Sequence, residues 1–260
     1  MKKILLIFLL ISVCFFSACS LEPEADEVDV LKAAKDRGKF IVGVSYDSKP
    51  FGFLNEKGEP DGFDVSIAKR IALSVFDNEN AIEYVEIKSG KAISSVSSGK
   101  VDFLVDAMTI TPQRQITIAF SEPYYTTGQA MLVKNDSKIS TIKDLNNKKV
   151  IVLLNTTSEH TPKKFAPAAV LIGFKTREEC FNALKNNEGE AMISDEALLK
   201  SFVSENPEYK ILPQKLSVEP YGIAVKNTDE GRALKKEIDT VLKQMKADGS
   251  LDELKQKWNL

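Results

Sequence analysis

The chain has 260 residues, a formal net charge of −2 at pH 7 and 28% charged residues. Basic and acidic residues are mixed along it without a basic block, which argues against nucleic acid as a partner. Two of its three cysteines lie in the first 19 residues, so a disulfide framework is excluded. The roughly 230 residues that follow are enough for one large domain or two modest ones.

The N-terminal residues have the pattern of a secretion signal. Lys2 and Lys3 precede an apolar run over residues 4–16, which is shorter than the about 20 residues needed to span a bilayer. The sequence Ser17-Ala18-Cys19 that follows resembles the lipobox of bacterial lipoproteins, in which the cysteine becomes a lipidated N-terminus. We therefore expect a signal peptide over residues 1–18 and an acyl chain such as palmitate on Cys19. An ordinary signal peptide cleaved nearby is the alternative.

Residues 19–29 are acidic and have no apolar period, which is typical of a solvated tether. No later run is apolar enough to cross a membrane, so the sequence predicts a soluble body held at the cell envelope, on its periplasmic or extracellular face, by the lipid. Cys180 lies in a helical pattern beside Phe181 and Leu184, which indicates a buried, unreactive thiol.

The first half of the body reads as alternating strands and helices. Residues 40–44 form an apolar run typical of a strand, and Asp64 is placed to cap the helix that follows. The apolar positions of that helix share one face: Ala68, Ile71, Ala72 and Val75. A shorter helix ends at Gly99, and residues 101–105 form the next strand.

The same alternation then begins again. Strands are predicted over residues 150–154, 170–174 and 191–193, and the segment 221–225 precedes a long helix. Thr176 and Glu179 form a capping box for a helix that ends near Gly189, and another helix runs through Leu198 and Leu199. Two similar units in succession predict an α/β fold with largely parallel sheets and two lobes. The cleft should lie at the carboxyl ends of their strands.

The C-terminal residues predict two helices. The first is long and places five apolar residues on one side: Leu234, Ile238, Val241, Leu242 and Met245. Gly249 ends it, and Ser250 with Glu253 is expected to cap the last helix.

Three polar stretches stand where strands give way to helices. In the first, Thr111 is placed to cap a helix and Pro112 suits its first position, so that Arg114 lies in the first turn. A guanidinium beside a helix N-terminus is well suited to a carboxylate, although a surface arginine is the simpler interpretation of Arg114 alone.

The second stretch is the turn of Asn155, Thr156, Thr157 and Ser158, whose hydroxyl and N–H groups are placed to bind the same carboxylate. The third is Asp195 at the end of strand 191–193, where it can pair with an ammonium group, cap a helix, or do both. Together these residues describe a site for an α-amino acid, because a buried zwitterion needs both of its charges paired.

The motifs of the chain resemble those of the polar amino acid-binding family of ABC transporter substrate-binding proteins. The resemblance extends over essentially the whole mature region and rests on the order and spacing of several segments. They are Lys49-Pro50-Phe51-Gly52-Phe53, Asp61-Gly62-Phe63-Asp64-Val65, Ser98-Gly99-Lys100-Val101-Asp102, Met108-Thr109-Ile110-Thr111-Pro112-Gln113-Arg114, Phe120-Ser121-Glu122-Pro123-Tyr124-Tyr125, and residues 248–258.

The resemblance implies a two-lobed periplasmic-binding-protein fold of type II with a two-strand hinge. Lobe 1 would comprise residues 30–127 and 221–260, lobe 2 residues 128–220, and the crossings would fall near 126–129 and 219–223. The family's carboxylate-binding arginine corresponds to Arg114 and its ammonium-binding aspartate to Asp195. Its remaining ligand positions correspond to Thr109, Ala107 (through a backbone carbonyl), Thr156, Thr157 and Ser158.

Several positions depart from the family pattern. Ser48 and Ser89 stand where members for glutamine or basic amino acids tend to have aromatic rings, and Leu154 stands where a polar residue commonly contacts the ligand side chain. Asn155 replaces the usual glycine of the second-lobe turn, and Asp106 is an unusual acid that could pair with a lysine or a cationic ligand. These signals conflict, so the sequence leaves the side chain of the ligand open.

By resemblance, the protein is a monomeric solute-binding component of an ABC importer, which captures a polar L-α-amino acid by hinge closure and delivers it to a permease. It needs no cofactor or metal. A lyase or dehydratase on the same fold is one alternative, but His160 is the only histidine and stands in an exposed turn, without a nucleophile–base constellation. A surface adhesin or the sensing module of a receptor is the other.

Overall fold

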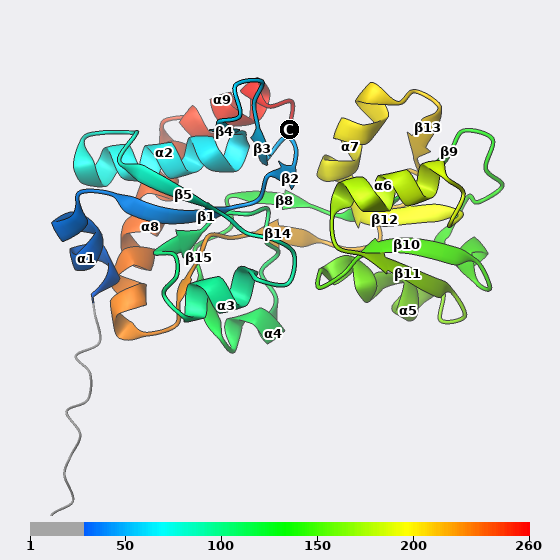
Figure 1. Cartoon of the computed structure of the whole chain (residues 1–260), viewed down its shortest axis with the longest axis horizontal. Helices are drawn as coiled ribbons and strands as arrows, with labels where there is room; N and C mark the ends of the chain where they lie inside the picture. The colour runs from blue at the N-terminus through cyan, green and yellow to red at the C-terminus, as the bar shows by residue number, and fades with distance from the viewer. Residues whose placement is uncertain (1–28) are drawn as a thin grey trace, which may run out of the picture.

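The computed structural model describes residues 29–260, which form two lobes side by side (Figure 1). The predicted signal peptide, Cys19 and all but the last residue of the predicted tether lie outside the described residues. No helix between residues 29 and 260 is both long and apolar enough to cross a membrane.

Lobe 1 is built on a five-stranded sheet of order β5-β1-β6-β15-β7. Its strands are β1 (Phe40–Val44), β5 (Ile82–Glu86), β6 (Phe103–Leu104), β7 (Ile118–Phe120) and β15 (Ala224–Lys226). A smaller sheet contains β2 (Asp47–Ser48), β3 (Gly52–Leu54) and β4 (Pro60–Asp61). The helices are α1 (Val30–Arg37), α2 (Phe63–Phe76), α3 (Ala92–Ser97), α4 (Pro112–Gln115), α8 (Asp229–Ala247) and α9 (Ser250–Lys257).

The core of lobe 1 lies between this sheet and the helices α2 and α8. The five apolar residues predicted to share one side of α8 are all buried, and they pack with Phe40 and Val42 of β1. Asp64, by contrast, does not cap α2: the N-cap is Gly62, and the Asp64 carboxylate accepts hydrogen bonds from the Ala107 N–H (2.7 Å) and the Tyr124 hydroxyl (2.9 Å). Asp64 therefore anchors the segment that follows β6.

Lobe 2 repeats the arrangement with a sheet of order β11-β10-β12-β9-β13. Its strands are β9 (Gln129–Lys134), β10 (Lys149–Leu153), β11 (Val170–Phe174), β12 (Ala191–Asp195) and β13 (Tyr209–Ile211). The helical segments are η1 (Ile142–Leu145), η2 (Thr157–Glu159), α5 (Thr161–Phe165), α6 (Arg177–Lys185) and α7 (Glu196–Glu205). Apolar clusters cover both faces of the sheet, and Cys180 is buried in one of them.

The sheets are mixed rather than largely parallel. In lobe 1, β1 runs parallel to β5 and β6, but β15 is antiparallel to β6 and β7. In lobe 2, β10 runs parallel to β11 and β12, but β9 is antiparallel to β12 and β13. The reversed strands β9 and β15 are those that enter each lobe directly from the other, and so they run against the strands beside them.

Two antiparallel strands connect the lobes: β8 (Tyr125–Thr127) and β14 (Glu219–Tyr221). Figure 1 shows them side by side between the two main sheets. The segment 221–225 is therefore not one continuous strand. Its backbone leaves the pattern at Gly222, whose N–H donates to Met108 O, and at Ile223, whose N–H donates to Ser121 Oγ.

Other predicted ends shift by a few residues. The strand predicted over 101–105 is only Phe103–Leu104, and the helix predicted to end near Gly189 ends at Lys185. The capping box of Thr176 and Glu179 is confirmed. Ser250 does not cap α9, because Gly249 occupies the N-cap with a φ of 81° and Ser250 is already the first helical residue.

Candidate functional site

The loops at the carboxyl ends of the strands meet between the lobes and enclose a cavity of about 80 Å³. Lobe 1 supplies residues from the loops after β1, β5 and β6, and lobe 2 supplies residues from the ends of β10 and β12 and the start of α6. At the about 10–15 Å³ that each water needs, the cavity holds roughly half a dozen waters. This is the scale of one free amino acid rather than of a peptide.

Arg114 lines this cavity from lobe 1. As predicted, Thr111 caps α4 by accepting from the Arg114 N–H (3.2 Å), and Pro112 occupies the first helical position. Arg114 Nη1 donates to Thr109 O (2.7 Å), which fixes the direction of the side chain. Because α4 spans only four residues, the guanidinium, rather than a helix dipole, supplies most of the positive charge.

Asp195 lines the same cavity from lobe 2, at the end of β12. Its side chain does not cap α7 and instead accepts a hydrogen bond from the buried Tyr221 hydroxyl. Burial raises the pKa of Asp195 to about 6, although the Tyr221 hydrogen bond lowers it. Near neutral pH, Asp195 is thus an anion that faces the cavity from the lobe opposite Arg114.

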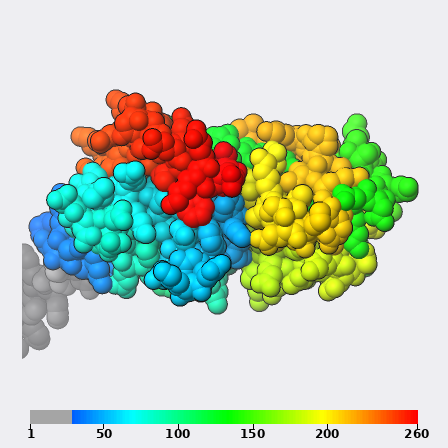
Figure 2. Space-filling model, turned by 90° about the horizontal axis from the view of Figure 1, so that it is seen from above, coloured from blue at the N-terminus to red at the C-terminus, as the bar shows by residue number. Residues whose placement is uncertain are grey.

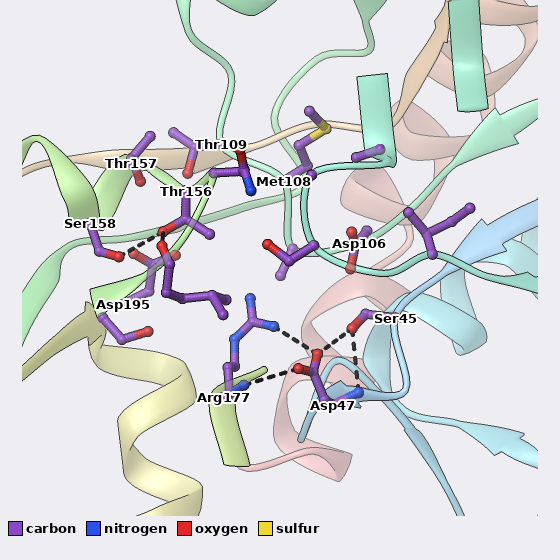
Figure 3. A pocket seen from close by; sticks show the side chains of 18 of the residues that line it. Ser45, Asp47, Asp106, Met108, Thr109, Thr156, Thr157, Ser158, Arg177 and Asp195 are labelled. Carbon is purple, nitrogen blue, oxygen red and sulfur yellow. Dashed lines mark hydrogen bonds and ion pairs between the residues drawn. The ribbon is translucent and has the colours of Figure 1, made fainter. Parts of the chain in front are cut away.

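The turn after β10 brings hydroxyl groups to the same end of the cavity (Figure 3). Asn155 adopts a φ of 63°, a left-handed conformation that asparagine tolerates better than most residues. Thr156 Oγ1 donates to Leu153 O (2.7 Å) and lies 2.6 Å from Ser158 Oγ. Thr157 Oγ1 is already engaged by Gln129 Nε2 and by Glu219 Oε2.

Three further predicted residues from lobe 1 also line the cavity: Thr109, Ala107 and Asp106. Ala107 has a φ of 42°, which turns the backbone sharply between β6 and α4 while its N–H remains bonded to Asp64. The Asp106 carboxyl makes no hydrogen bond or ion pair with any residue in 29–260. Removal from bulk water raises its pKa to about 8.

Two predicted residues lie outside the cavity. The Ser48 side chain is fully buried within lobe 1. The Leu154 side chain points toward β11, where a Cβ on Gly173 would come within 2.2 Å of it, so only the Leu154 backbone faces lobe 1. The Leu154 carbonyl accepts a hydrogen bond from Ser89 Oγ (2.5 Å), which makes this pair a contact between lobes.

Sequence reasoning missed Arg177 and Asp47, which line the cavity from opposite lobes. Arg177 Nη1 donates to Asp47 Oδ1 (2.9 Å), and the Arg177 N–H donates to Asp47 Oδ2 (3.1 Å). Burial alone would raise the pKa of Asp47, but Arg177 and the Ser45 hydroxyl lower it overall. The sequence held one signal that Arg177 has a special role. It directly follows the N-cap Thr176, at a helix N-terminus, where the helix dipole disfavours a cation.

Within residues 29–260, no group of three or more His, Cys, Asp or Glu side chains is arranged to hold a metal ion. The cavity instead collects amino acid side chains of both charges with hydroxyl groups between them, which can bind a small zwitterion.

Several known proteins are similar to this chain in sequence and in structure. The family model of bacterial extracellular solute-binding proteins, family 3, matches residues 40–260. The ABC transporter glutamine-binding protein GlnH of Bacillus subtilis is 37% identical over 268 residues, covering 99% of this chain and 97% of its own. A glutamine-binding protein of Geobacillus stearothermophilus is 40% identical over 197 residues, covering 75% of each chain.

Among solved structures, an ancestral arginine-binding protein bound to arginine superposes with a TM-score of 0.79 at 36% identity. The match covers 85% of this chain and 98% of that one.

Proposed function

Because the chain belongs to the bacterial extracellular solute-binding proteins of family 3 and has their type II two-lobed fold, we propose that it binds a polar L-α-amino acid for an ABC importer. One observation carries the proposal: Arg114 and Asp195 line one small cavity from opposite lobes. Its curated relatives are named as binding proteins, which supports a binding role over a lyase or dehydratase.

In this proposal, Arg114 binds the α-carboxylate, with Thr156, Ser158 and the backbone of the 155–158 turn completing its hydrogen bonds. Asp195 binds the α-ammonium, together with the Thr109 hydroxyl and the Ala107 carbonyl. A ligand that contacts both lobes favours their closure by its higher affinity for the closed arrangement. The permease of the importer then recognises the closed protein.

Isothermal titration calorimetry tests this function. The purified protein is first refolded from denaturant to remove any carried-over ligand and is then titrated with L-amino acids and their D-enantiomers. We expect one or two L-amino acids to bind, and Arg114→Ala to weaken them by about 2–5 kcal/mol, because it leaves a buried carboxylate unpaired. Asp195→Asn should weaken the same ligands through the ammonium group. If no amino acid binds, or if both variants bind as the wild type does, the proposed site is wrong.

The relatives also support a location in the cell envelope. We further propose that residues 1–18 are a signal peptide, that Cys19 carries the lipid, and that the mature protein is a monomer with lobes divided near 127/128 and 220/221. Cys19→Ser should move the protein from the membrane fraction to the soluble envelope fraction. Retention of that variant on the membrane would contradict the anchor.

A further inference from the structure

The cavity has a second end that the α-amino and α-carboxylate groups of a ligand do not occupy. Figure 3 shows Thr156, Ser158 and Asp195 on one side, and Ser45, Asp47, Asp106 and Arg177 gathered on the other. If Arg114 and Asp195 hold the α groups, the side chain of the ligand points toward this second end. What these four residues offer therefore decides which side chain is bound.

Asp47 has little hydrogen-bonding capacity left for a ligand. It accepts from the Ser45 hydroxyl (2.6 Å) and twice from Arg177. The Asp47–Arg177 pair is electrically neutral and spans the two lobes. Its function is to position the Arg177 guanidinium at the cavity wall.

Arg177 and Asp106 do have capacity left. Arg177 uses only Nη1 in hydrogen bonds from its side chain; Nε is buried and has no partner among the described residues, and Nη2 has no hydrogen bond there. The Asp106 carboxyl has no hydrogen bond to residues 29–260, and of all charged groups Arg177 influences it most. This end of the cavity thus presents the unused Nη2 donors of Arg177 beside an unused carboxyl group.

We propose that Arg177 and Asp106 are the specificity-determining residues and select an L-amino acid whose side chain ends in a primary carboxamide, as in glutamine and asparagine. The carboxamide oxygen accepts from the Arg177 guanidinium, and the carboxamide –NH₂ donates to Asp106. This inference rests on the proposed function, because the α groups must be held at the other end for the side chain to arrive here.

Other classes of side chain fit this end less well. A cationic side chain brings only donors, leaves the Arg177 N–H groups without an acceptor and places a second positive charge beside them. A carboxylate brings only acceptors, so it leaves the Asp106 carbonyl oxygen without a donor, and it brings a negative charge to an arginine that Asp47 already neutralises. An apolar side chain leaves both groups unpaired, and sites built to hydrogen-bond a ligand discriminate strongly against such analogues.

The ionisation state of Asp106 distinguishes a ligand with a carboxamide side chain from one with a cationic side chain. With its pKa raised to about 8, the carboxyl is largely uncharged at pH 7, and an uncharged carboxamide binds without changing that. A cationic ligand would have to ionise it and release a proton. The charged groups that face Asp106 are Arg177, Asp64, Asp47 and Arg114.

The test is a titration calorimetry panel of glutamine, asparagine, glutamate and arginine against the wild type and three variants, scored as affinity ratios within each protein. A ratio cancels any general defect in folding or closure. Asp106→Ala should shift the glutamine-to-glutamate preference toward glutamate by at least about tenfold, because a carboxylate needs only the Arg177 donors. Arg177→Gln should shift the glutamine-to-arginine preference toward arginine by a similar factor.

Lys49→Gln is the matched control. Lys49 pairs with Glu205 across the lobes (2.8 Å), as Arg177 pairs with Asp47, but it lies outside the cavity. This variant should leave both ratios unchanged.

Tighter wild-type binding of arginine or glutamate than of glutamine and asparagine would overturn the carboxamide assignment and leave the proposed function intact. Ratios unchanged within threefold in both cavity variants would overturn the roles of Arg177 and Asp106. Binding of no amino acid at all would overturn the proposed function itself, and this inference with it.

Discussion

The affinity of the protein for its amino acid should depend on pH through Asp195. The ammonium group of the ligand needs an ionised carboxylate, and burial raises the pKa of Asp195 to about 6. Glu219 raises this pKa further, whereas Tyr221, Arg177 and Arg114 lower it. Below the pKa, a proton must leave before the ligand binds, so affinity falls about tenfold for each pH unit. We expect Kd to be about tenfold higher at pH 5 than at pH 7.

Tyr221→Phe tests the same reasoning from the other side. It removes the hydroxyl that donates to Asp195, and a hydrogen bond to a charged group is worth about 1.5–3 kcal/mol. Its loss raises the pKa of Asp195, enough to weaken binding at pH 7 by about two- to tenfold. Because the loss arises from protonation, it should largely disappear at pH 8.5. Isothermal titration between pH 5 and 8.5 measures both profiles.

The control for these profiles is Asp195→Asn, which should bind weakly and without pH dependence between pH 5 and pH 7, where Asp106 stays largely uncharged. A flat wild-type profile would show that Asp195 does not meet the ammonium group. An equal loss for Tyr221→Phe at every pH would show that the hydroxyl acts on the packing of the hinge and not on the charge of Asp195.

Three predictions concern stability and are measured by urea unfolding. Gly62→Ala should cost more than about 1 kcal/mol, since φ is 126° and a Cβ would lie 2.1 Å from Phe51 O; a smaller cost would mean that the loop relaxes freely. Ile238→Ala should cost about 2–5 kcal/mol, against less than about 0.5 for the exposed Lys236→Ala on the same helix. Thr176→Ala should cost about 0.5–2 kcal/mol and, because α6 carries Arg177, should also weaken ligand binding; an unchanged Kd would separate the cap from the site.

Much of the fold was predictable because its signals are local. The capping box of Thr176 and Glu179 and the apolar face of α8 lie within a few turns of chain, and both are confirmed. The predictions failed where contacts with distant segments determine the local structure. Asp64 has the composition of a helix cap but bonds to Ala107 and Tyr124, which are 43 and 60 residues away.

The residues of the site also divide into those that a local sequence pattern predicts and those that depend on contacts with distant segments. Asp195 and the 155–158 turn lie at the ends of strands, which face the cleft in such folds, and Arg114 lies in a short helix that Thr111 and Pro112 indicate, so their positions could be predicted from local pattern. Leu154 also follows a strand, but its side chain points toward Gly173 of β11 and not into the cavity. Arg177 stands 130 residues from Asp47, and no local pattern marks a pair that forms only where α6 of one lobe meets β2 of the other.

These contacts between the lobes link specificity to closure. Figure 2 shows the light-blue segment of lobe 1 against the yellow segment of lobe 2. Lys49 of lobe 1 forms an ion pair with Glu205 of lobe 2. Both side chains of that pair are more than half exposed, and such surface pairs contribute about 0–1 kcal/mol. The Arg177 side chain is only 13% exposed, and the guanidinium that pairs with Asp47 also lines the ligand cavity. A side chain that bonds well to Arg177 therefore stabilises the same contact that joins the lobes. A ligand of the wrong class should lose affinity at its side chain and close the protein less completely.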